Sequence, residues 1–511
     1  MEKLSNKNLI IISIFFLTLI ECYHPTLYEI STRPWLYELS QKYKKNITKL
    51  RDIPLEEFDK LAEKGIEYVW MMGVWQLGNY GLELDQKNNY SSVLPDYKKE
   101  DIIGSPFAIT EYVCNKELGT DEDLKWLKET LHSKNLKLLL DFVPNHSAVD
   151  SPTAETYPNF YIRVPKGQST WDPKYYTDSG LAYGKDPYFD PWPDVIQWNY
   201  FEPNTRQFML NNLMKILSLS DGVRCDMAHL MLNDVFKNTW ALELNSWGYK
   251  VPSTEFWEDA IKTVKDKYPD ALFLAEVYEE WEIQKLYELG FDYCYDKALL
   301  DKFELNSYDI NEYIHYKTIE FFGHVSHFIE NHDENRGVYN MGSVEKSNAA
   351  GTIAATVGGM IFMNHGQWNG LKNKLDVHLR RGADENISIK AQQHYDKLMN
   401  IIKDKAFHSK SYYFVYNMSG DAASRFVAYI RNDENNFLVV VNYSEYSGCA
   451  NVPIYNIIGS GMVFVYEMFS DIEYSRNAET IRNSGLTVCL EAYQSQIFKY
   501  NYSNNKKNYS E

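Results

Sequence analysis

Residues 136–146 read Leu-Lys-Leu-Leu-Leu-Asp-Phe-Val-Pro-Asn-His, a short apolar strand that ends in polar side chains. The same pattern recurs through the middle of the chain, with amphipathic helices expected over 121–134, 204–218 and 253–267. Asp121 is the expected N-terminal cap of the first of these helices. Strands are expected near 35–39 and over 66–72, 136–143, 222–227, 272–277, 291–295, 325–330 and 360–364. This alternation predicts parallel βαβ units, and eight such units predict a closed (β/α)8 barrel.

Two stretches break the alternation and divide the chain into regions. Residues 147–201 show no clear strand or helix but many Pro, Tyr, Trp and Asp side chains, which predicts a subdomain inserted after the third barrel strand. From 407 onward, short alternating strands predict a separate antiparallel β-domain. The expected regions are a signal peptide at 1–23, the barrel at 24–146 and 202–406, the inserted subdomain at 147–201, the β-domain at 407–503 and a polar tail at 504–511.

The composition of the 511-residue chain is that of a folded globular protein, with 44% hydrophobic and 24% charged residues. Its formal net charge of −18 argues against a nucleic-acid partner, because binding phosphates needs a basic surface. A neutral or cationic substrate is favoured instead. The aromatic content of 15% is compatible with sugar-stacking surfaces, but it fits an ordinary core equally well.

The N-terminus indicates a secretory route. The apolar run from Leu9 to Ile20 follows Lys3 and Lys7, as in a signal peptide. Twelve helical residues span only about 18 Å of a hydrocarbon layer of about 30 Å, so no stable membrane partner is expected, although an uncleaved signal anchor stays open. Glycosylation triplets give weak further support for a secreted glycoprotein; they begin at Asn46, Asn89, Asn386, Asn417, Asn442, Asn501 and Asn508.

The cysteine spacing predicts neither a zinc site nor a framework of disulfides. Cys22 is expected to leave with the signal peptide, which leaves five cysteines. Cys449 and Cys489 lie in the same β-rich region and can pair if the fold brings them close, which the sequence does not settle.

Acidic side chains gather at the expected strand ends, where a parallel barrel assembles its active site. Asp226 and Glu276 are 50 residues apart (276 − 226) but are expected at the tips of adjacent strands. Cleaving an acetal needs one such carboxylate as nucleophile and one carboxylic acid as proton donor. Arg224 lies on the same side of its strand as Asp226 and is expected to keep it ionised, whereas Glu276, between Ala275 and Val277, is expected to hold its proton.

Four of these strand ends resemble the sequence regions of the α-amylase family, glycoside hydrolase family 13. They are Asp-Phe-Val-Pro-Asn-His at 141–146, Asp-Gly-Val-Arg-Cys-Asp at 221–226, the strand ending in Glu276, and Glu-Asn-His-Asp at 330–333. The resemblance extends from Trp35 to the C-terminus. It implies a (β/α)8 barrel with a subdomain inserted after strand three and a C-terminal antiparallel β-sandwich.

The resemblance also assigns roles to the carboxylates. It implies that Asp226 is the nucleophile, Glu276 the general acid/base, and Asp333 the carboxylate that binds sugar hydroxyls and stabilises the transition state. The implied activity is hydrolysis of α-glucosidic bonds, foremost α-1,4 bonds in starch-like glucans or malto-oligosaccharides, with retention through a covalent glucosyl-Asp226 intermediate.

Further positions are implied to contact the substrate. Arg224, His146 and His332 are expected around the sugar before the cleaved bond, and His229 at the sugar beyond it. Phe107 stands where many members carry a stacking Tyr, although core packing explains a Phe nearly as well. Gly104 stands where several exo-acting relatives have a carboxylate, and the absence of that carboxylate favours an open cleft and internal cleavage.

Calcium is the only cofactor that the resemblance implies. Asn145 matches the family's usual ligand, but Gln197 stands where an Asp normally supplies negative charge. Because calcium prefers anionic oxygens, the site is expected to be weak or absent, and Asn145 then simply ties down its loop.

Two other functions remain open. The glucosyl intermediate can be released by a sugar hydroxyl instead of water, which would make the protein a transglycosylase. A catalytically inactive, membrane-anchored binding subunit is the second possibility, against which the intact set of Asp226, Glu276 and Asp333 argues.

Overall fold

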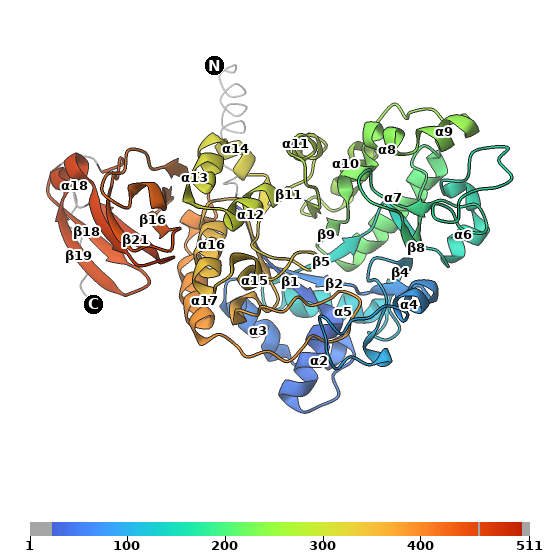
Figure 1. Ribbon diagram of the computed structural model, residues 1–511, viewed down its shortest axis with the longest axis horizontal. Coiled ribbons are helices and arrows are strands. Elements are labelled where there is room, and N and C mark those ends of the chain that lie inside the picture. The colour runs from blue at the N-terminus through green and yellow to red at the C-terminus, as the bar shows by residue number, and fades with distance from the viewer. Residues whose placement is uncertain (1–22, 458–459, 503–511) are drawn as a thin grey trace, which may run out of the picture.

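The computed structural model describes residues 23–457 and 460–502, and its centre is a closed barrel of eight parallel strands (Figure 1). The strands follow the order β1-β13-β12-β11-β10-β9-β5-β2 around the barrel. Their bounds are β1 Thr26–Ser31, β2 Tyr68–Met72, β5 Lys137–Phe142, β9 Gly222–Cys225, β10 Leu272–Ala275, β11 Tyr293–Tyr295, β12 Val325–His327 and β13 Met360–Asn364. The predicted (β/α)8 barrel is therefore confirmed, and β9, β10 and β12 end earlier than expected at their polar ends.

The expected first strand near 35–39 is wrong. The first strand is β1, and residues 35–39 lie in helix α2 (Thr32–Tyr43), whose buried Trp35, Leu36 and Leu39 line one helix face. All six residues of β1 are buried, including Glu29. A carboxylate inside an apolar run breaks the pattern by which a buried strand is recognised. Glu29 can be buried here because His332, distant in the sequence, pairs with it.

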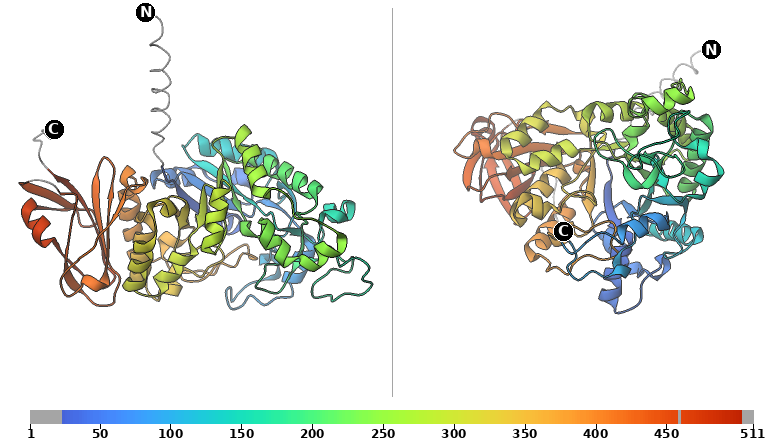
Figure 2. Two further views of the ribbon diagram at one scale, coloured as in Figure 1. Left: turned by 90° about the horizontal axis from the view of Figure 1, so that it is seen from above. Right: turned by 45° about the vertical axis from the view of Figure 1, so that its right-hand side comes forward.

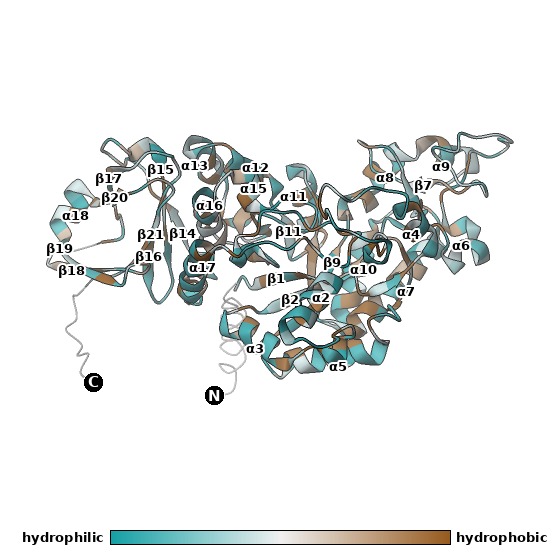
Figure 3. Cartoon of the chain, turned by 60° about the horizontal axis from the view of Figure 1, so that its bottom comes forward, coloured by the Kyte–Doolittle hydropathy of each residue, from teal (hydrophilic) through white to brown (hydrophobic). Residues whose placement is uncertain are grey.

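Amphipathic helices cover the outside of the barrel. In α5, the buried Leu124, Leu127 and Leu131 repeat at helical spacing, and Figure 3 shows hydrophobic and hydrophilic segments mixed along this helix. The helices that follow the barrel strands include α3 Leu55–Glu63, α5 Asp121–His132, α7 Pro203–Leu219, α10 Phe256–Lys267, α11 Glu280–Glu288, α12 Lys297–Glu304, α13 Ser307–Tyr316, α16 Val344–Thr356 and α17 Ile389–Ile401.

The predicted cap of α5 is wrong by one residue. The N-terminal cap is Thr120, whose amide donates to Oδ2 of Asp123 at 2.8 Å in a capping box. Asp121 instead accepts from the amide of Cys114 at 2.8 Å. Its carboxylate thus links the helix start to the preceding strand.

A small three-stranded sheet lies between β5 and β9 in the sequence. Its order is β6-β8-β7, with β6 at His146–Ala148, β7 at Tyr183–Gly184 and β8 at Trp192–Gln197. Helix α6 (Pro152–Thr156) belongs to the same segment. In Figure 1 this region occupies the end of the molecule opposite the C-terminal sheets.

The C-terminal region consists of two antiparallel sheets. One has the order β14-β15-β16-β21-β18-β19, and the other pairs β17 with β20. Buried residues of both sheets share one apolar cluster, as in a β-sandwich. The bounds are β14 Tyr412–Phe414, β15 Phe426–Asn432, β16 Asn436–Asn442, β17 Gly448–Val452, β18 Met462–Glu467, β19 Ile472–Asn477, β20 Leu486–Leu490 and β21 Ser495–Tyr502.

Strand β15 of the larger sheet is buried on both faces. Along β15, Phe426, Ala428 and Ile430 join the sandwich core, whereas Val427 and Tyr429 join the core of the barrel. The views in Figure 2 show this sheet standing beside the yellow and orange barrel helices. The sandwich is therefore packed onto the barrel rather than tethered to it.

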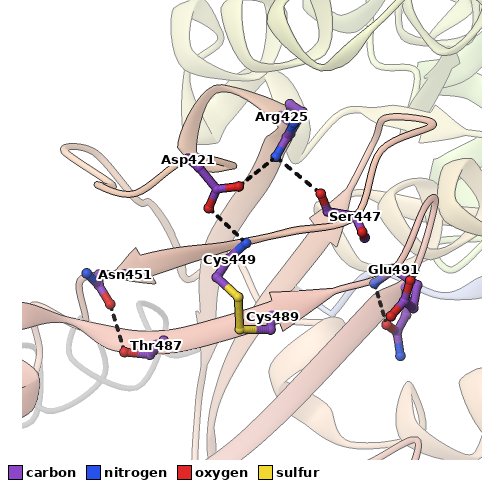
Figure 4. Close-up of a disulfide and its surroundings, with 9 residues drawn as sticks. Asp421, Arg425, Ser447, Cys449, Asn451, Thr487, Cys489 and Glu491 are labelled. Atoms are coloured by element: carbon purple, nitrogen blue, oxygen red, sulfur yellow. Dashed lines mark hydrogen bonds and ion pairs between the residues drawn. A yellow bond between two sulfur atoms is a disulfide. The ribbon is translucent and has the colours of Figure 1, made fainter.

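Cys449 and Cys489 are directly opposed on β17 and β20 and form a disulfide (Figure 4). The pairing that the sequence left open is thereby resolved. Cys114, Cys225 and Cys294 are buried free thiols.

The predicted signal peptide and polar tail lie outside the described residues, apart from Tyr23. Among residues 23–457 and 460–502, the search for a helix with the length and hydrophobicity to cross a bilayer found none.

Candidate active site

The register of two neighbouring strands brings Asp226 and Glu276 together. β9 and β10 are parallel, and Cys225 pairs with Ala275 as their last residues. Asp226 and Glu276 come next on each strand, and the amide of Glu276 donates to the carbonyl of Cys225 at 3.0 Å. Both side chains are buried, at 6% and 3% residue exposure. The expected meeting of these two carboxyls at one mouth of the barrel is thus what the fold produces.

Arg224 joins the two carboxyl groups. Its Nη1 lies 2.6 Å from Oδ1 of Asp226, and its Nη2 lies 2.6 Å from Oε2 of Glu276. The two carboxyls therefore face each other across the width of one guanidinium. The sequence predicted contact with Asp226 alone, so the shared contact with Glu276 is a new finding.

The guanidinium is completely enclosed. Its exposure is 0%, and Cζ lies 5.2 Å from the ring centroid of Trp70, 5.3 Å from that of Phe107 and 5.8 Å from that of Tyr295. A buried charge is stable only where it is paired, and here the carboxylates and the aromatic rings together stabilise the Arg224 charge. Because its neighbours are negative, the pKa of Arg224 is raised despite burial.

Met227, which follows Asp226, adopts a left-handed backbone conformation that directs its amide to Glu276. Met227 has φ 43° and ψ 45°, which costs about 1–2 kcal/mol for a residue with a side chain. In this conformation its amide donates to Oε2 of Glu276 at 2.8 Å. Oε2 thus accepts from both Met227 and Arg224, so Oε1 is the oxygen left to carry a proton.

Burial raises the pKa of both Asp226 and Glu276, and Arg224 opposes the rise in each. The negative charges of Asp226 and Asp333 add to burial in raising the pKa of Glu276. Two buried carboxyls this close do not both ionise readily. The arrangement therefore favours one charged and one protonated group, as general acid catalysis requires.

A third carboxylate, Asp333, faces the same space and is held by His332. Nε2 of His332 lies 3.0 Å from Oδ2 of Asp333, and its Nδ1 lies 2.6 Å from Oε1 of Glu29. Although burial opposes it, the charges of Asp333 and Glu29 raise the pKa of His332 to about 10. Burial alone would raise the pKa of Asp333, but the His332 charge holds it below its usual range.

These side chains open into one pocket of about 500 Å³. Asp226, Glu276 and Asp333 line it together with Phe107 and His146. The pocket is also lined by Ser105, Asp186, Phe189, Trp192, Asp194, Val195, Met227, Tyr278, Lys297, Glu334 and His378. Its size is that of a small-molecule site.

The remaining predicted contacts differ in their placement. Phe107 fits both interpretations that the sequence allowed. Its ring packs 5.3 Å from that of His332, and its side chain also lines the pocket. His146 is 6% exposed and burial lowers its pKa to about 4, so it is neutral at physiological pH. His229 is not among the pocket-lining residues; it is 3% exposed and packs its ring 6.3 Å from that of Tyr278.

Sequence reasoning missed Tyr278 and Glu29. Tyr278 donates its hydroxyl to Oε1 of Glu276 and lines the pocket. Its position two residues after Glu276, on the same side of the chain, was a usable signal. Glu29 was visible only as a carboxylate in an apolar run, because its partner His332 lies 303 residues away.

The residues at the expected calcium position do not fit that ion. Nε2 of Gln197 donates to the main-chain O and to Oδ1 of Asn145, at 2.9 Å each. Both oxygens thus already accept a hydrogen bond from an amide nitrogen, whereas calcium prefers anionic oxygen ligands. In the described part of the chain, no three His, Cys, Asp or Glu side chains converge as a metal cluster. Through Gln197, Asn145 ties its loop to β8, which is the alternative role that the sequence left open for it.

Comparisons with known proteins agree with this geometry. The family model described as "Alpha amylase, catalytic domain" matches residues 95–427. The chain is 26% identical to "Alpha-amylase 3" of Dictyoglomus thermophilum, over 54% of this chain and 56% of that protein. It is 23% identical to "Alpha-glucosidase" of Apis mellifera, over 62% and 59%. The chain thus matches little more than half the length of these curated relatives.

Among solved structures, a "noncanonic maltogenic alpha-amylase AmyB from Thermotoga neapolitana" shares the fold. Its TM-score is 0.65 at 19% identity, over 93% of this chain and 98% of that one. The match extends across barrel, inserted segment and C-terminal sheets.

Proposed function

Because the chain belongs to the α-amylase catalytic-domain family, we propose that it hydrolyses α-glucosidic bonds of starch-like glucans or malto-oligosaccharides with retention of configuration. The observation that carries the proposal is the pairing of Asp226 and Glu276 at adjacent strand ends, each 2.6 Å from one terminal nitrogen of Arg224. Retaining glycosidases place their two carboxyl groups about 5 to 5.5 Å apart, near enough for both to reach one glycosidic bond.

In the first step, a carboxylate oxygen of Asp226 attacks the anomeric carbon and forms an ester with it. The bond to the leaving oxygen breaks as Oε1 of Glu276 gives that oxygen its proton. In the second step, ionised Glu276 takes a proton from water, and the resulting hydroxide displaces Asp226 from the sugar. Two inversions at the same carbon give overall retention.

Asp333, His332 and Arg224 act on the charge that develops in the sugar. The transition state resembles an oxocarbenium ion, so the negative Asp333 beside it is favourable. His332, charged near neutral pH, fixes Asp333 through Nε2 while Glu29 fixes the other side of the imidazole ring. This preorganisation avoids the cost of reorienting dipoles as the reaction proceeds.

The direct test is incubation with soluble starch, maltotriose and pullulan, followed by chromatography and proton NMR of the first product anomer. Hydrolysis that releases the α-anomer supports the proposal. Asp226→Asn and Glu276→Gln are each expected to lower the rate at least about 10³-fold, since each removes one group of a coupled pair. Glu258→Gln, an exposed carboxylate on α10, is the matched control. Unchanged activity in either active-site variant contradicts the assignment.

The same experiment separates hydrolysis from transfer. With maltoheptaose as donor, a transglycosylase makes chains longer than seven sugars, whereas a hydrolase makes only shorter ones. We propose hydrolysis, and accumulation of longer chains at low donor concentration argues for transfer instead.

We also propose that the protein is secreted. The Cys449–Cys489 disulfide supports this, because structural disulfides persist in oxidising compartments. Cell fractionation of the expressed protein, with activity measured in the medium and in the membrane pellet, tests it.

A further inference from the structure

Two loops at the mouth of the barrel are fastened to each other, and we call the fastened segments, residues 96–103 and 376–381, the clasp. The first follows β2, and the second follows β13. In Figure 1, the segment that leads into α17 runs across to the blue segments near α4 (Asn79–Asp85). The pairing Ile102–Leu379 forms an antiparallel bridge, and these two residues are buried in a small apolar cluster.

Main-chain hydrogen bonds close the clasp on both sides of that bridge. The amide of Ile103 donates to the carbonyl of His378 at 2.8 Å, and the amide of Arg380 donates to the carbonyl of Asp101 at 2.8 Å. The two loops therefore behave as a short two-stranded ribbon. Surface loops without such bonds move independently.

A nearly buried ion pair adds to the closure. Arg381 donates from Nε and Nη2 to the two carboxylate oxygens of Asp101, at 3.0 and 3.1 Å, in a fork geometry. The side chains are only 12% and 9% exposed. Nη1 of Arg381 also reaches Oδ1 of Asp96 at 3.2 Å. Such a pair is costly to break by removing one partner.

The position of the clasp relative to Glu276 follows from the strand order. β2 and β13 both neighbour β1, and β10, which directly precedes Glu276, lies four strands from β1 in either direction. The clasp therefore lies across the barrel mouth from the proton donor. A general acid must face the leaving group, so the non-reducing end of the donor sugar points toward the clasp.

Both loops contribute to the pocket wall on that side. Ser105 and Phe107 extend from the first loop and His378 from the second, and Asp194 joins them. The imidazole and carboxylate offer hydrogen bonds to the hydroxyls of a terminal sugar. An internal chain segment would have to pass the wall that these residues form.

The position of Gly104 does not support the open cleft that the sequence favoured. Gly104 has φ +81°, and a Cβ there would meet backbone atoms of Leu82 in α4 at 3.4 Å. The positive φ would strain any residue with a side chain at this position. The backbone conformation therefore explains the glycine, and the missing carboxylate does not by itself indicate an open cleft.

We propose that the pocket is closed on its donor side by the clasp, so that the enzyme acts from the non-reducing end of short α-glucan chains. This rests on the proposed function, of which it specifies the substrate class. An exo-acting enzyme must recognise a free terminal 4-hydroxyl, whereas an endo-acting enzyme does not.

Maltoheptaose and its analogue blocked at the terminal 4- and 6-hydroxyls by an ethylidene group test the proposal. Chromatography is expected to show cleavage of free maltoheptaose and at least about ten-fold slower cleavage of the blocked analogue. Equal rates on both overturn the exo assignment and leave the proposed function standing. Cleavage of neither overturns the proposed function, and with it this inference.

Opening the clasp tests its role. Arg381→Ala is expected to raise the ratio of blocked to free substrate cleavage at least about ten-fold, while Arg381→Lys, which keeps the charge but loses the fork, gives a smaller rise. Arg425→Ala removes a more exposed arginine–aspartate ion pair in the C-terminal region (Figure 4) and is expected to leave the ratio unchanged. Circular dichroism verifies folding. An unchanged ratio in folded Arg381→Ala contradicts the role of the clasp.

Discussion

Arg224 binds Glu276 through Nη2 and Oε2 at 2.6 Å, although Glu276 is the carboxyl proposed to donate a proton. A positive neighbour favours the ionised carboxylate, so burial and the nearby negative charges must outweigh it if Glu276 is to be an acid near neutral pH. The proposed formation of the ester removes the charge of Asp226, which lowers the pKa of Glu276 and prepares it to act as a base. The shared arginine thus couples the two carboxyls through both steps.

Tyr278 is expected to set the upper pH limit of activity. Its hydroxyl donates to Oε1 of Glu276 and so favours the ionised form, which lowers the pKa of the acid. Tyr278→Phe removes this bond and is expected to move the alkaline limb of the kcat/KM profile to higher pH. Tyr316→Phe, at an exposed position, serves as control. A shift to lower pH, or no shift, contradicts this role of Tyr278.

His332 is expected to contribute a pH-dependent part of the stability. Its pKa is raised from 6.5 to about 10 in the folded protein, so folding favours the protonated ring. The contribution is fully present below about pH 6.5 and is lost as pH rises toward about 10. The difference in free energy of unfolding between wild type and His332→Gln, measured by urea denaturation, should therefore shrink across this range. A difference in free energy of unfolding that stays constant across this pH range would falsify the proposal that His332 is charged in the folded protein.

Folding is expected to be independent of calcium. Gln197 already cross-links the two Asn145 oxygens that an ion would bind, so a chelator should leave the Tm of the wild type unchanged. Gln197→Asp replaces the N–H donor with a carboxylate, and its Tm should fall in chelator and recover with added calcium. A lower wild-type Tm in chelator indicates that calcium binds and contradicts the exclusion of the ion.

The disulfide is expected to stabilise the C-terminal sheets. It closes a loop with a sequence separation of 40 residues, and removing a bridge of this kind typically costs about 2–4 kcal/mol. Cys449→Ala is therefore expected to lower the free energy of unfolding by that amount in denaturant titrations. Cys294→Ala, at a buried free thiol, shows how much of the effect comes from lost packing. Equal stability of wild type and Cys449→Ala would contradict this contribution.

The sequence predicts the barrel well where an apolar run precedes the polar end of a strand, as in residues 138–140 of β5 and in β10. It fails at β1, because Glu29 interrupts the pattern and its neutralising partner His332 is distant in the chain. Asp226 and Glu276 could be paired in advance because strand register is regular. The contacts of Gln197 and Arg381 could not, since each depends on how two loops meet.

Trapping the glucosyl intermediate is the most direct test of the double displacement. α-Glucosyl fluoride needs no proton donor for its first step, and Glu276→Gln lacks the base for the second, so the ester should accumulate. Mass spectrometry of the intact variant should show the added mass of one hexosyl group, and proteolysis should place it on the peptide that contains Asp226. The double variant Asp226→Asn/Glu276→Gln should show none. No adduct in Glu276→Gln, or an adduct on another carboxylate, would contradict catalysis through Asp226.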